Sequence, residues 1–163
     1  MSEESVWKPL DWLVDKMKAF GALCLVGMMG LTCADVVGRF FRHPIFGSVE
    51  LVGFMATTAI AMGLPFTHKI GAHVGVELVV RLLSDRTQKM VELFTRILSL
   101  GLFALITWRM SVYAYEMHKS GEVSMNLELP EYVVIYITAF CIFIQTLVII
   151  NEIKTLVSSL RRK

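Results

Sequence analysis

Residues 132–151 read YVVIYITAFCIFIQTLVIIN, a run of 20 residues without a charged side chain. An α-helix rises about 1.5 Å per residue, so about 20 apolar residues cross the roughly 30 Å hydrocarbon core of a bilayer. The composition of this stretch leaves no polar face that could point towards water. Residues 132–151 therefore predict a transmembrane helix.

Three shorter uncharged runs precede this stretch in the chain: residues 19–34, 51–67 and 97–108. The third run is the shortest, but Arg96 and Arg109 flank it. Long cationic side chains can reach towards headgroups while their stems stay in lipid, so we extend this span to residues 90–115. The sequence predicts an all-α polytopic membrane protein, in which residues 1–163 form a single four-helix transmembrane domain. The spans are expected at about residues 17–38, 51–67, 90–115 and 132–151.

Composition separates this chain from a soluble helical protein with an apolar core. Hydrophobic residues make up 55% of the chain and charged residues 18%, whereas an ordinary globular domain has about 45–50% and about 25%. A surface helix of a soluble protein also keeps a polar stripe. The four runs show no such stripe, which favours membrane insertion.

The distribution of Lys and Arg residues predicts the orientation. Excess Lys and Arg stay on the cytoplasmic side of a membrane. With four spans, the N-terminus, the connection between the second and third spans, and the C-terminus share one side, and most of the 16 Lys and Arg residues fall there. We therefore expect both termini to be cytoplasmic. The basic run at residues 161–163 favours anionic phospholipid, rather than nucleic acid, as its partner.

The first sixteen residues predict an amphipathic helix in the membrane interface. They lack the apolar core of a cleavable signal peptide. Their apolar residues recur at helical spacing, with charged residues largely elsewhere, as in helices that lie between headgroups and acyl chains. The apolar face consists of Val6, Trp7, Leu10, Leu13, Val14 and Met17. Residues 74–83 form a second stretch of this kind, and the sequence equally allows them to continue one long bent helix.

The sequence gives no sign of catalysis or of a bound cofactor. It contains no Gly-rich phosphate loop, no His-Glu-x-x-His and no nucleophile elbow. The three cysteines lack metal-ligand spacing. A haem held between facing helices would need paired histidines at mid-depth, but His43 and His118 fall on the expected outer side and His68 and His73 on the inner side. We therefore predict a chain that is not an enzyme and holds no cofactor or metal.

Charged side chains are also missing from the centres of the four runs. Ionisable residues at mid-bilayer usually mark ion or substrate pathways. Matching Gly or Pro interruptions, which point to a transport site, are not apparent either. The sequence therefore predicts a scaffold rather than a permeation path.

Small residues recur every four positions in the first two spans. Such spacing lets helix backbones approach closely in lipid, where the ordinary hydrophobic drive is missing. The six positions are Gly30, Ala34 and Gly38 in the first span, and Gly53, Thr57 and Ala61 in the second. These stripes either pack against each other or receive a second protein.

Three segments together resemble a known family. Residues 34–51 read ADVVGRFFRHPIFGSVEL, residues 71–77 read GAHVGVE, and residues 127–132 read LELPEY. They are similar, in order and between the expected spans, to segments of the small membrane subunit (DctQ type) of tripartite ATP-independent periplasmic (TRAP) transporters. Gly75 and Glu77 depart from the family's pattern, and Tyr132 stands where Trp is commoner.

The resemblance implies a division of labour. In this family a periplasmic binding protein delivers an organic acid, often a dicarboxylate or a sialic acid, and a large multi-span permease moves it with a sodium gradient. The small subunit, in the bacterial inner membrane, braces the large one. Sodium ions are then expected in the partner subunit, with no cofactor in this chain.

The resemblance also assigns candidate residues. The small-residue stripes named above become the expected large-subunit interface. The loop positions expected to order the family motifs or to dock the binding protein are Asp35, Arg39, Arg42, Glu50, His73 and Pro130. The alternative function is a self-contained four-span transporter or channel that acts as a homo-oligomer.

Overall fold

The computed structural model describes residues 4–69 and 85–161, and within these ranges it consists of four helices. The helices are α1 (Glu4–Phe40), α2 (Ser48–Lys69), α4 (Asp85–Ser120) and α5 (Glu131–Arg161). All four are long and apolar enough to cross a membrane. The prediction of an all-α polytopic membrane protein is confirmed, and each expected span lies inside one of these helices.

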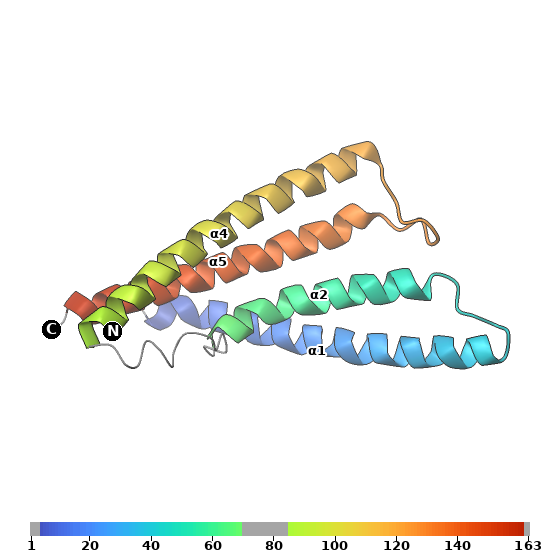
Figure 1. The fold of residues 1–163 in the computed structure, drawn as a ribbon, viewed down its shortest axis with the longest axis horizontal. Coiled ribbons are helices and arrows are strands. Elements are labelled where there is room, and N and C mark those ends of the chain that lie inside the picture. The colour runs from blue at the N-terminus through green and yellow to red at the C-terminus, as the bar shows by residue number, and fades with distance from the viewer. Residues whose placement is uncertain (1–3, 70–84, 162–163) are drawn as a thin grey trace.

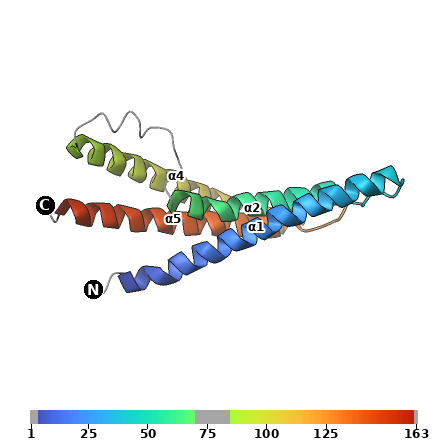
Figure 2. The same ribbon diagram turned by 90° about the horizontal axis from the view of Figure 1, so that it is seen from below.

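The helices form two antiparallel hairpins, α1 with α2 and α4 with α5 (Figure 1). Residues 41–47 and 121–130 connect the helices at one end, which we call the loop end. Both chain termini lie at the opposite end, which we call the terminal end (Figures 1 and 2). That the terminal end is cytoplasmic stays a prediction from the positive charges.

The four helices pack as a row rather than as a closed bundle. Helix α1 packs on α2, α2 packs on α5, and α5 packs on α4. In the most apolar 18-residue window of each helix, 44% of the residues of α5 are buried and 0% of those of α4. Helix α5 therefore lies in the middle of the row, and α4 lies at its edge.

A small core lies where α1, α2 and α5 meet. It consists of Val14, Met17, Ala61, Cys141, Ile144 and Val148. Nearby, Gly21 allows α1 and α2 to approach closely, because a Cβ atom at this position would lie 3.2 Å from the carbonyl oxygen of Ala59. Removing a side chain at a helix crossing is how membrane helices gain van der Waals contact.

The amphipathic N-terminal segment is helical, as expected, but it is continuous with the first span. Helix α1 has 37 residues, which corresponds to about 55 Å of length and exceeds the roughly 30 Å of hydrocarbon. Val14 and Met17, from the face assigned to the membrane interface, are buried in the protein core instead. Trp12 on the opposite side is 63% exposed. From Leu10 to Met17 the apolar stripe thus packs against protein, a distinction that helical periodicity cannot make. Residues 74–83 lie outside the described residues.

Helix α4 includes Arg109 well inside its length. In the sequence this residue borders the uncharged run 97–108 and falls within the expected span 90–115. The helix continues without a break to Ser120, and the stretch that is long and apolar enough to cross a membrane extends from Met90 to Ser120. Arg109 is therefore an internal residue of this candidate span.

Candidate functional site

Asp35 ties the first loop to α1. Its carboxylate accepts a hydrogen bond from Arg39 Nε at 2.8 Å and, through its other oxygen, from the backbone N–H of Ile45 at 2.9 Å. Asp35 is 7% exposed. The four-residue spacing of Asp35 and Arg39, recognised in the sequence, thus forms a local ion pair, and the same carboxylate orders the loop.

The end of α1 is a Schellman turn with an unusual residue at its left-handed position. The N–H of His43 donates to the carbonyl of Gly38 at 2.8 Å, and that of Arg42 donates to Arg39 at 3.1 Å, which is the pairing of this motif. Arg42 has φ 60°, where Gly is usual. A Cβ atom at Gly38 would collide with the carbonyl oxygen of His43. Gly38 is therefore needed by its own loop, and its expected role at the large-subunit interface stays a prediction.

Glu50 joins the two hairpins at the loop end. One carboxylate oxygen accepts from the backbone N–H of Asn126 at 2.9 Å and from its Nδ2 at 2.7 Å, and the other accepts from the N–H of Leu127 at 3.1 Å. Gly47 packs against the same loop. Its φ is 72°, and a Cβ atom at this position would collide with the Leu127 side chain. Both features hold the 121–130 loop against the start of α2.

The 121–130 loop is itself a compact turn. The N–H of Ser124 donates to the carbonyl of Leu129 at 2.9 Å, and Val123 forms an antiparallel bridge with Pro130. Apolar side chains project from the loop end: Met125 is 98% exposed and Phe46 is 73% exposed. The result is a well-ordered surface with protruding apolar groups.

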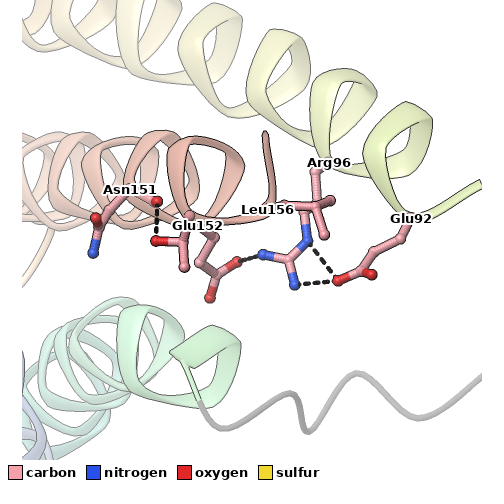
Figure 3. Close-up of a pocket in the computed structure, with 6 residues that line it drawn as sticks. Glu92, Arg96, Asn151, Glu152 and Leu156 are labelled. Atoms are coloured by element: carbon pink, nitrogen blue, oxygen red, sulfur yellow. Dashed lines mark hydrogen bonds and ion pairs between the residues drawn. The ribbon is translucent and has the colours of Figure 1, made fainter. Parts of the chain in front are cut away.

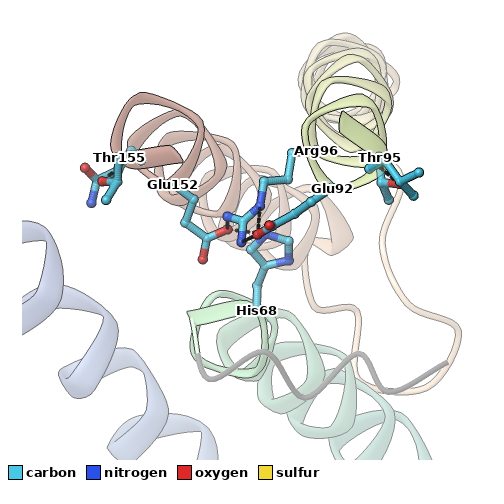
Figure 4. Close-up of polar contacts among 8 residues, drawn as sticks. His68, Glu92, Thr95, Arg96, Glu152 and Thr155 are labelled. Atoms are coloured by element: carbon cyan, nitrogen blue, oxygen red, sulfur yellow. Dashed lines mark hydrogen bonds and ion pairs between the residues drawn. The ribbon is translucent and has the colours of Figure 1, made fainter. Parts of the chain in front are cut away.

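A polar cluster at the terminal end joins α2, α4 and α5. Arg96 on α4 donates to Glu92 on the same helix through Nη2 at 2.7 Å and to Glu152 on α5 through Nη1 (Figure 3). His68 on α2 approaches the same Glu152 carboxylate, with Nε2 at 3.0 Å (Figure 4). An open cleft of about 330 Å³ lies beside the cluster, lined also by Asn151, Thr155 and Leu156.

Sequence reasoning found only part of this cluster. The spacing of Glu92 and Arg96 is readable as a pair four residues apart on one helix. Arg96 and Glu152 are 56 residues apart in the sequence, so no local sequence pattern predicts their contact. Glu152 was visible only as a charge at the inner end of the fourth span.

Sequence reasoning also missed a polar side chain inside α5. Gln145 is 0% exposed, and among the described residues neither of its amide atoms has a hydrogen-bond partner. The neighbouring Thr146 hydroxyl lies 3.5 Å from that of Thr107 on α4. Gln145 and Thr146 are two adjacent polar residues in a run that is otherwise mostly apolar, and this pairing could have singled them out.

The small-residue stripes do not pack against each other. Gly30 and Ala34 on α1, and Gly53 and Thr57 on α2, are exposed. A Cβ atom at Gly30 or Gly53 would meet nothing within 4 Å. Ala61 alone of its stripe lies in the protein core. For the four exposed positions the internal-packing alternative is wrong, and docking of a second protein stays a prediction.

The remaining candidate positions gather at one end. Asp35, Arg39, Arg42, Glu50 and Pro130 all lie at the loop end, on the two connections or beside them. His73 lies outside the described residues. The loop end therefore holds every candidate loop residue that the structure describes.

Comparison with protein families identifies this arrangement. The family model described as "Tripartite ATP-independent periplasmic transporters, DctQ component" matches residues 28–161. The chain belongs to the DctQ family. No curated protein sequence matches it. The chain is thus the small membrane subunit of a TRAP transporter and a multi-pass membrane protein. The DctQ family is a transporter component, not an enzyme family, and it works in general with a large permease and a periplasmic binding protein.

Proposed function

We propose that this DctQ subunit is a static brace in a sodium-coupled transporter of the bacterial inner membrane. The transporter would import an organic acid of the dicarboxylate or sialic acid class. The observation that carries the proposal is the pair of polar ties at the two ends of the contact between α2 and α5. Glu50 makes one tie at the loop end and Glu152 the other at the terminal end.

These ties matter because lipid weakens the drive for helices to associate. In a bilayer, apolar side chains gain little from leaving lipid, so packing and hydrogen bonds decide how helices meet. The two hairpins adjoin each other chiefly along α2 and α5. Fixing both ends of this contact makes the hairpins one rigid unit, which suits a brace beside a moving transport domain.

The loop end is the surface that we propose for the periplasmic binding protein. Arg39 and Arg42 are exposed at this end, which also carries the protruding Met125 and Phe46. Exposed apolar groups ringed by charged ones are typical of protein interaction sites. We propose that sodium ions bind in the large permease.

A brace and a self-contained transporter give opposite results in reconstitution. The chain should copurify with the large permease, and sodium-driven uptake should need both subunits and the binding protein. Purified chain alone in liposomes should move no organic acid. Accumulation of solute by the chain alone would instead support a homo-oligomeric transporter.

Loss of the Glu50 tie tests the rigid unit itself. Glu50→Ala should lower uptake and make the 121–130 loop more sensitive to protease, because three hydrogen bonds that order the loop are lost. Asp15→Ala, at an exposed carboxylate of α1 near the terminal end and away from the proposed docking surface, is the control. Uptake by Glu50→Ala equal to that of the control would contradict the proposed role of the tie.

A further inference from the structure

Two interhelical contacts mark the depth of residues along α4. Arg96 pairs with Glu152 at the terminal end, and the His118 ring lies 4.5 Å from the Tyr132 ring at the loop end. Tyr132 and Glu152 are separated by about 30 Å along α5 at 1.5 Å per residue, which matches the thickness of the hydrocarbon core. Tyr is also common at the membrane boundary. We infer that these two contacts lie near the two faces of the bilayer.

Arg109 lies between these boundaries. At the rise of a helix it is about 13 Å from His118 and about 20 Å from Arg96. A cation at this depth is costly in lipid and usually faces protein or water. Among the described residues, no hydrogen bond or ion pair reaches Arg109, and its side chain is exposed.

The face of α4 that carries Arg109 is the one turned away from α5. Ala114, fully buried, and Thr107, which faces Thr146, mark the side towards α5. Leu98, Leu102 and Leu105 precede Arg109 at spacings of four, three and four residues, so all four share a face. These leucines are 65%, 55% and 56% exposed. Helix α4 thus presents a ridge of leucines that ends in a cation.

We propose that this ridge packs on a membrane-embedded helix of a partner subunit, and that Arg109 binds a carboxylate on that helix. Leucines at this spacing fit the groove of another helix, and a buried cation selects an acidic partner. Lipid phosphates are a poorer match, since they lie near the boundaries rather than at the depth of Arg109. The inference rests on the proposed function in taking the large permease as the partner.

Capture of the large permease by affinity-tagged chain tests this pairing. The amount of permease captured by Arg109→Gln should fall about tenfold or more, because the partner's carboxylate is left buried without its cation. Arg109→Lys, which keeps the charge, should retain most of it. Lys119→Gln removes a cation from the loop end of the same helix and should behave as the wild type. The amount of each variant in the membrane fraction shows whether the chain is inserted. Arg109→Gln should insert at least as well as the wild type, because it removes a charge from the membrane.

A charge exchange identifies the partner residue. Each intramembrane Asp or Glu of the permease is changed to Arg in the presence of Arg109→Glu, and one such exchange should restore capture. Equal capture by Arg109→Gln and wild type would overturn the inference, as would failure of every exchange. Failure of the wild-type chain to capture the permease would instead contradict the proposed function from which the inference starts.

Vesicles without the permease test the lipid as a competing ligand. The chain is reconstituted in phosphatidylethanolamine alone or with added phosphatidylglycerol, and its thermal unfolding is compared with that of Arg109→Gln. The inference expects the same response to phosphatidylglycerol in both proteins. Stabilisation by the anionic lipid that disappears in Arg109→Gln would make lipid phosphate the ligand and overturn the carboxylate assignment.

Discussion

Helices α5 and α4 have similar candidate spans, of 28 and 31 residues, but opposite surroundings. Nearly half of the apolar window of α5 is buried, and none of the window of α4 is. Polar groups follow this difference. Gln145 on α5 is enclosed by protein, whereas Arg109 on α4 is exposed. A central helix can cover polar side chains within the chain on more than one side, whereas an edge helix has a face that no other described helix covers.

The sharpest way to break this comparison is to remove equal volumes from the two helices. Ile149→Ala in α5, at a side chain that is 0% exposed, should lower the free energy of unfolding of the isolated chain by about 2–4 kcal/mol through cavity formation. Leu105→Ala in α4 should change it by less than about 0.5 kcal/mol. Unfolding in mixed micelles measures both. Equal losses would show that α4 is packed as tightly as α5.

A smaller effect is expected at the terminal end of α5. The Glu152 side chain is 21% exposed and contacts both Arg96 and His68. Glu152→Gln weakens both contacts. We expect a loss of about 1.5 kcal/mol, the scale of a hydrogen bond to a charged group. Glu116→Gln, at an exposed position of α4, is the control and should be neutral. A double-mutant cycle with Arg96→Gln measures the coupling, and additivity would contradict the tie.

Gln145→Leu tests whether burial alone explains the polar interior of α5. Both amide atoms lack partners among the described residues, and a buried polar group without a hydrogen bond is unfavourable. The substitution should therefore raise the free energy of unfolding by about 1 kcal/mol. The same unfolding assay measures it, with Ile142→Leu as a volume-matched control. Destabilisation would mean that the amide has a partner in the folded chain.

The smallest effect is expected where α4 meets α5 through two hydroxyl groups. Thr146 already donates to the carbonyl of Ile142 at 2.9 Å, and its contact with Thr107 is 3.5 Å long. Thr146→Val keeps the shape of the side chain and should cost no more than about 0.6 kcal/mol, a typical value for such bonds in membranes. A loss of several times that size would make the hydroxyl pair a principal link between the helices.

Local features of the chain were predictable because their causes are local. The Asp35 and Arg39 pair follows from spacing on one helix, and the four runs follow from hydrophobicity. Arg109 borders an uncharged run, yet it lies within the expected span 90–115, because long cationic side chains can belong to a span that reaches past such a run. Helix α4 continues beyond that span to Ser120.

The small-residue stripes show where local reasoning ends. Gly30 and Gly53 have the spacing of a helix contact but are exposed, whereas Gly21 makes the close approach of α1 to α2. Spacing identifies a face that could be packed closely, and it is the same whichever neighbour occupies it. The choice between such faces depends on how all the helices fit together.

The sequence by itself determined that four helices cross the membrane, because each helix satisfies its own backbone hydrogen bonds and each apolar run meets lipid independently of the others. Only the tertiary structure decided that α5 is central, that α4 is at the edge and that Glu50 reaches Asn126 across 76 residues. These outcomes depend on the fit of side chains from distant segments, since lipid supplies little drive of its own for choosing one helix neighbour over another.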